Sequence, residues 1–83
     1  MMERVIRGVP LWLLREYVVA VGADASRGDW LLGAGWQARL TQIDDYVVGS
    51  LRVGQVKLVI EGEADPVTQA WAALEPKLLR GGG

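Results

Sequence analysis

The segment that decides the fold is Trp36–Glu61, which reads WQARLTQIDDYVVGSLRVGQVKLVIE. Apolar and polar residues alternate along most of it, as is typical of strands with one buried face. Two turn candidates divide the segment. The first is Asp44-Asp45, and the second is Gly54-Gln55, where glycine at the first central position suits a two-residue type II′ hairpin. The pattern therefore predicts three antiparallel strands in a meander.

Alternation along these strands assigns each side chain to one face of the sheet. Tight turns at both positions place Ile43 opposite Tyr46 and Arg52 opposite Lys57. One face is then apolar except for a single glutamine and glycine, which predicts that it covers the core. This face comprises Trp36, Ala38, Leu40, Gln42, Val47, Gly49, Leu51, Val53, Val56, Leu58 and Ile60.

The flanking sequence predicts one more strand and two helices. Glu3–Arg7 favours a short strand, and an apolar stripe over Leu11–Val21 predicts a helix that ends at Gly22. The loop over Ala23–Gly35 contains an apolar insert, Trp30–Leu32, that we expect to lie on the core. A second helix follows the capping residue Asp65 and the first-turn residue Pro66, and Pro76 predicts its end or a kink near Glu75.

These elements give the order β-α-β-β-β-α. We predict an α+β fold, a two-layer sandwich in which two helices cover one face of a four-stranded mixed sheet with an antiparallel meander. Its 83 residues are enough for a single domain. We assign residues 1–80 to this domain and residues 81–83 to a flexible glycine tail.

Composition excludes several classes of function. The chain has no cysteine and no histidine, which removes thiol chemistry and the commonest general base and metal ligand. A net charge of −1 predicts neither nucleic-acid nor membrane binding. The N-terminus resembles no signal peptide, so we expect a cytoplasmic protein. The absence of asparagine and cysteine fits a thermophile, and codon bias explains it equally well.

The second face of the predicted meander has an apolar end. Ile43, Tyr46, Val48 and Val59 lie there, and helices confined to the other face leave these side chains exposed. Exposed apolar patches of this kind mark contacts with other proteins. We therefore predict self-association through this face or a sheet edge, with an unknown protein as a further partner.

The same face has a basic end formed by Arg39, Arg52 and Lys57. Like charges that face each other across strands cost stability, so a bound anion or acidic metabolite is one explanation for them. A solvated face with a nearby carboxylate is the other. The cations are not interleaved with aromatic residues, which argues against single-stranded nucleic acid.

The acidic residues Asp24, Asp29, Asp44 and Asp45 predict no catalytic or metal site. Asp44-Asp45 favours a turn, where aspartate bonds locally to the backbone, and the calcium-loop spacing is absent. No glycine motif for phosphate is present either. We therefore expect no enzymatic activity, no catalytic residues and no cofactor.

The C-terminus ends in three glycines, Gly81–Gly83. Ubiquitin-like and sulfur-carrier proteins also end in a Gly-Gly tail whose terminal carboxylate is activated, so a carrier that uses Gly82 and Gly83 is an alternative function. In that fold, however, the tail follows a strand, whereas here it follows a predicted helix.

Three segments together resemble a small bacterial domain of unknown function. They are Gly8–Tyr17 (GVPLWLLREY), Gly49–Val56 (GSLRVGQV) and Leu74–Gly81 (LEPKLLRG). That domain also occurs fused behind a sulfur carrier of the MoaD type, which is similar to the small subunit of molybdopterin synthase. The resemblance implies a two-layer α+β fold and an accessory role in molybdopterin or sulfur-transfer pathways. It implies no catalytic residues, and this chain lacks the carrier domain.

Overall fold

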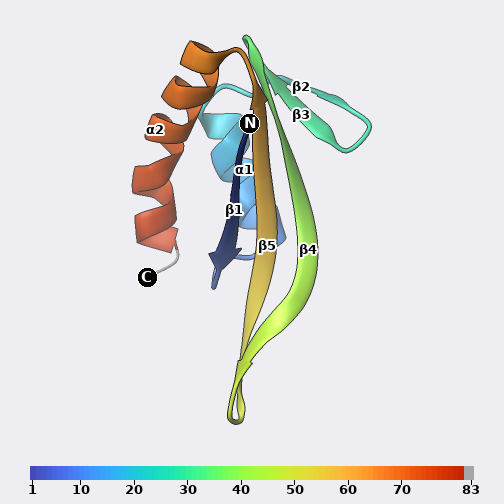
Figure 1. The fold of residues 1–83 in the computed structure, drawn as a ribbon, viewed down its shortest axis with the longest axis vertical. Coiled ribbons are helices and arrows are strands. Elements are labelled where there is room, and N and C mark those ends of the chain that lie inside the picture. Colours follow the sequence, from blue (N-terminus) through green and yellow to red (C-terminus); the bar gives the residue numbers. More distant parts are fainter. Residues whose placement is uncertain (82–83) are drawn as a thin grey trace.

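The computed structural model describes residues 1–81, and it contains two helices and one sheet (Figure 1). The sheet has five strands in the order β1-β5-β4-β3-β2, and every neighbouring pair is antiparallel. The elements in chain order are β1 (Met2–Arg7), α1 (Leu11–Ala20), β2 (Ala25–Arg27), β3 (Trp30–Gly33), β4 (Trp36–Val48), β5 (Leu51–Gly62) and α2 (Ala64–Gly81).

The predicted α+β class is confirmed, but the sheet differs from the prediction in two ways. It has five strands instead of four, and it is antiparallel instead of mixed. Two strands, β2 and β3, form a short hairpin inside the region predicted to be a loop, while the three predicted strands of the meander are only two, β4 and β5. The apolar insert in this region does lie on the core, since Leu31 is only 8% exposed. Strands of three and four residues are too short to show alternation.

The predicted meander is a single long hairpin. β4 continues through Asp44-Asp45, where the structure has a bulge instead of a turn, and Gly54-Gln55 lies inside β5. The chain reverses at Gly49-Ser50, where Gly49 has a φ of 58°. Glycine at the first central position suits a type II′ turn equally well here, and this position lets two long strands pair along their whole length.

The predicted register was therefore wrong on the distal side of the hairpin. Tyr46 lies opposite Val53 and not Ile43, and Arg52 lies opposite Val47 and not Lys57. The core face was nevertheless assigned correctly nearer the body. The buried residues Ala38, Leu58 and Ile60 share that face, as predicted.

Both helices pack on the same face of the sheet, as predicted, because one core cluster contains residues from α1, α2 and the sheet. Leu14 and Val18 of α1 and Leu74 of α2 are 0% exposed within it. The cluster comprises Ile6, Val9, Leu14, Val18, Ala23, Leu31, Trp36, Ala38, Val56, Leu58, Ile60, Val67, Ala70, Trp71 and Leu74. The opposite face of the sheet carries no helix (Figure 1).

The second helix does not end near Glu75. It continues through Pro76 to Gly81. The division into a domain of residues 1–80 and a flexible tail of residues 81–83 stays a prediction, and residues 82 and 83 lie outside the described residues. Leu78, beyond the proline, still packs against the core. Partial burial of that side chain favours continuation of the helix and opposes the loss of the backbone hydrogen bond that the proline removes. Asp65 lies inside the first turn of α2 and does not precede it.

Candidate interaction surface

The distal end of the β4–β5 hairpin extends beyond the rest of the molecule, and we call residues 44–54 the arm (Figure 1). Pairing of β5 with β1 ends where Gln55 meets Arg7, and pairing of β4 with β3 ends where Arg39 meets Trp30. The arm is therefore a two-stranded ribbon. Two strands without a third or a covering helix are marginally stable in water.

One side of the arm, which we call its outer face, is apolar. It consists of the cross-strand pairs Tyr46–Val53 and Val48–Leu51, which lie on the same side because alternate pairs share a face. Tyr46 is 40% exposed, Val48 is 53% exposed and Leu51 is 62% exposed. Four neighbouring apolar side chains, none of them fully buried, are unusual on a part of the chain that no other element covers.

A network of polar contacts fixes the base of the arm. Two residues of β4, Asp44 and Asp45, oppose one residue of β5 in a bulge, which bends and twists the ribbon. The side-chain amide of Gln55 donates to the backbone oxygen of Asp44 at 2.8 Å, and its oxygen accepts from Nε of Arg7 at 2.8 Å. The Arg7 guanidinium also stacks on Tyr46, 4.0 Å from the ring centre. The last residue of β1 therefore holds the arm in a defined orientation.

The other side of the arm is charged. A shallow hollow there is lined by Gln42, Ile43, Asp44, Asp45, Val47 and Arg52. Within residues 1–79, whose side chains the structure describes, the ion pair between Lys57 and Glu3 is the only one formed, so Arg52 does not pair with either aspartate. The two faces of the arm thus differ in chemistry, since the outer face is apolar and the other combines the exposed Val47 with charged side chains that form no ion pair.

Three of the four predicted interface residues occur together at this end of the molecule. Tyr46 and Val48 lie on the outer face, and Ile43 borders it just before the bulge. Val59 does not join them, because it lies on the body of the sheet between Glu3 and Arg39 and is 4% exposed.

Two residues of the outer face, Leu51 and Val53, were predicted to lie on the core face, and that assignment is wrong because both lie on the arm, where Leu51 is 62% exposed. The signal that finds them is Gly49-Ser50, the second possible type II′ turn in the sequence.

The three predicted anion-binding residues do not form one cluster. Arg39 stacks on Trp30 at 4.8 Å, Lys57 lies 3.9 Å from a carboxylate oxygen of Glu3, and Arg52 lies on the arm. The repulsion between Arg52 and Lys57 that motivated the site is absent, since the two are not opposite each other. Anion binding by these residues stays a prediction. The carrier residues Gly82 and Gly83 lie outside the described residues.

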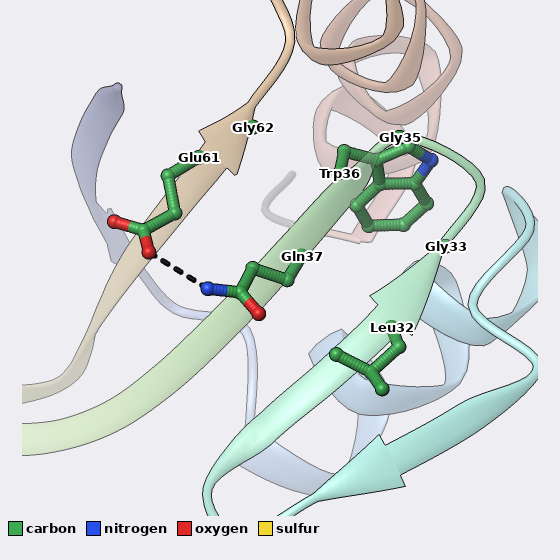
Figure 2. Close-up of a pocket in the computed structure, with 7 residues that line it drawn as sticks. All are labelled: Leu32, Gly33, Gly35, Trp36, Gln37, Glu61 and Gly62. Carbon is green, nitrogen blue, oxygen red and sulfur yellow. Dashed lines mark hydrogen bonds between the residues drawn. The ribbon is translucent and has the colours of Figure 1, made fainter.

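A second hollow, of about 400 Å³, lies at the opposite end of the sheet (Figure 2). Its lining residues are Leu32, Gly33, Gly35, Trp36, Gln37, Glu61 and Gly62. Gln37 donates to the Glu61 carboxylate at 2.7 Å across β4 and β5. A Cβ on Gly33 would lie within 2.4 Å of the Trp36 ring, and one on Gly62 would lie 2.4 Å from the backbone oxygen of Gly35. Packing of the Trp36 ring therefore explains Gly33, and close approach of the backbone at Gly35 explains Gly62.

Metal binding and membrane insertion find no support in the part of the chain that the structure describes. No three acidic side chains among those residues gather closely enough to hold a metal ion. Neither described helix combines the length and the apolarity that a membrane crossing requires.

Comparison with known proteins identifies the family. No curated protein matches the chain. A family described as "Archaeal MoaD-like protein" matches residues 2–83, which is nearly the whole sequence. The resemblance to a MoaD-related domain is thereby confirmed, although the description of the family names archaea and not bacteria. The chain therefore belongs to the family of archaeal MoaD-like proteins.

Proposed function

We propose that the chain is a non-enzymatic interaction domain that forms homo-oligomers through the outer face of its arm. The observation that carries this proposal is the pair of cross-strand contacts Tyr46–Val53 and Val48–Leu51, which are apolar and adjacent and which only the Arg7 guanidinium, stacked on Tyr46, partly covers within the described residues. The body of the protein has its own core, so these side chains are not needed to build it. Burial against another protein is the physical use that remains for them.

A second copy of the chain is a suitable partner for this face. An isologous contact brings the same patch from both subunits together, and an apolar patch needs no complementary charge to pair with itself. The outer face contains no charged side chain between its four members. Two such ribbons can pack face to face at about 10 Å, the usual spacing of stacked sheets.

Sedimentation velocity over a range of protein concentrations tests the oligomer. We expect the wild type to form a dimer and Leu51→Lys to be a monomer. Leu79→Lys is the matched control, because Leu79 is also an exposed leucine, 81% exposed, but lies on α2. The control should remain dimeric. A wild type that stays monomeric at millimolar concentration would rule out self-association.

The proposed pathway is molybdopterin synthesis or sulfur transfer, in which the domain acts as an accessory. Membership of a MoaD-like family supports this choice. Deletion of the gene in its host should lower the cellular content of molybdenum cofactor, measured as its fluorescent oxidation product. Expression of the wild-type chain should restore it. An unchanged cofactor content would argue against the pathway and would leave the oligomer unaffected.

A carrier protein is the second candidate, and the match that extends to Gly83 supports it. The terminal carboxylate would be adenylated by a partner enzyme and converted to a thiocarboxylate. Intact mass after incubation with the host's adenylating enzyme, ATP and a sulfur donor tests this. A mass increase that corresponds to replacement of one oxygen by sulfur supports the carrier. An unchanged mass, together with full activity of a chain without Gly82 and Gly83, contradicts it.

A further inference from the structure

One edge of β4 has no neighbouring strand along most of its length. β3 pairs with β4 only from Trp36 to Arg39, although β4 continues to Val48. In Figure 1 the β2–β3 hairpin diverges from β4, and no element lies along the rest of that edge. Alternate backbone N–H and C=O groups of residues 40–48 therefore point toward solvent. We call residues 40–48 the free edge.

The charge on the free edge is acidic. Asp44 and Asp45 are both exposed and lie at its middle, at the bulge. Aspartate is depleted in strands, so two adjacent aspartates inside a strand need an explanation. Within the described residues neither of them forms an ion pair. Arg52 lines the same hollow as both aspartates but forms no ion pair with either, so both carboxylates can accept a cation from a partner.

These charges decide which strand can pair there. If two copies of the chain joined through their whole free edges about a two-fold axis centred on Asp44, Asp44 of each copy would face its counterpart, and like charges directly opposite each other are destabilising. A bulge and acidic side chains also protect an edge from unspecific pairing. The acidic charge disfavours a second copy and acidic segments and leaves a basic strand as the favourable occupant. The bulge has no preference for charge, and it limits any incoming strand to pairing on either side of it.

We propose that the free edge of β4 binds an extended, basic segment of a partner protein as an additional strand. Backbone hydrogen bonds to residues 40–48 supply the affinity, and lysine or arginine side chains opposite Asp44 and Asp45 supply the selectivity. The site differs from the outer face of the arm, which contacts a second copy through side chains. The two contacts are independent, since one uses an edge of the ribbon and the other uses a face.

Amide NMR with a synthetic probe tests this proposal. The probe is a peptide of alternating lysine and valine that is long enough to span Leu40–Val48. We expect it to slow hydrogen exchange at alternate amides of the free edge and to shift their resonances. A peptide of alternating glutamate and valine should not bind. A lysine–valine peptide with alternate backbone nitrogens methylated should not bind either, because it cannot form the strand.

Separate variants test whether peptide binding requires the negative charge of the free edge. Asp44→Asn with Asp45→Asn should weaken binding of the lysine–valine peptide by about fivefold at low salt, since exposed ion pairs are individually weak. Asp29→Asn, in the turn between β2 and β3, is the matched control and should bind as the wild type does. The Leu51→Lys variant should keep peptide binding while losing self-association, which separates this proposal from the previous one.

Three results would overturn the inference. The first is equal binding of the methylated and unmethylated peptides, because backbone pairing would then not be involved. The second is a set of shifts on the body of the sheet around Lys57 with none on residues 40–48. The third is protection of the free edge in the peptide-free protein as its concentration rises, which would assign the edge to a second copy.

Discussion

The two ends of the β4–β5 hairpin contain the same kinds of residue in opposite environments. In the body, Val56 is 1% exposed, and Leu58 is fully buried. On the arm, Val48 is 53% exposed and Leu51 is 62% exposed. The difference arises from coverage, because α1, α2 and flanking strands surround one end, whereas no helix or third strand of the described residues covers the other. An apolar residue in a strand thus predicts burial. It does not reveal whether the covering group belongs to the same chain or to a partner protein.

The largest expected effect comes from the same substitution at the two ends. Leu58→Ala should lower the free energy of unfolding by about 3 kcal/mol, because it leaves a cavity in a core that cannot close around it. Leu51→Ala should lower it by less than about 0.5 kcal/mol in the monomer. Urea denaturation at low protein concentration measures both. Equal losses would mean that the arm is part of the core and would remove the contrast between the two ends.

A smaller contrast is expected between two glycines with positive φ. Gly62 has a φ of 143°, and an added Cβ would lie 2.4 Å from a backbone oxygen, whereas Gly49 has a φ of 58° and no atom within 4 Å of an added Cβ. Gly62→Ala should therefore cost about 3 kcal/mol from strain and overpacking, and Gly49→Ala about 1 kcal/mol from strain alone. Thermal unfolding compares them. A Gly49→Ala variant that is the less stable of the two would contradict this ranking.

The smallest effect concerns the polar contacts at the base of the arm, where the two ends of the hairpin meet. Arg7→Ala removes both the stacking on Tyr46 and the hydrogen bond to Gln55. We expect a loss of less than about 1 kcal/mol in global stability, because these contacts are exposed. Hydrogen exchange at the amides of the arm should become faster than in the wild type. Arg15→Ala, an exposed arginine on α1, should leave arm exchange unchanged. Unchanged exchange in Arg7→Ala would show that Arg7 does not hold the arm.

Where the sequence predicted correctly, local chemistry and burial agreed. The stripe over Leu11–Val21 predicted α1 within one residue of its observed end, and alternation placed Ala38, Leu58 and Ile60 on the core face. Where it predicted wrongly, two local signals competed. Gly49-Ser50 and Gly54-Gln55 both suit a type II′ turn, and only the length of strand that each lets pair decides between them.

The competition between two turn signals also explains why only part of the candidate surface was predicted. Ile43, Tyr46 and Val48 follow from β4 alone, so any nearby turn keeps them together. Leu51 and Val53 come from β5, and their place opposite these residues depends on the position of the turn. Val59 was misassigned because its place on the open face suggested exposure, whereas the side chains on β1 and β4 beside it leave it buried.

The sequence by itself determined the α+β class, the limits of α1, and the side of the sheet that becomes the core, because helix stripes and strand alternation are local properties of the chain. It also excluded thiol and histidine chemistry, since those residues are absent. Only the tertiary structure decided the order of the strands, the extra β2–β3 hairpin and the projection of the arm. These features depend on which distant segments pair and on how far two helices extend along a sheet. Local sequence patterns specify neither of them.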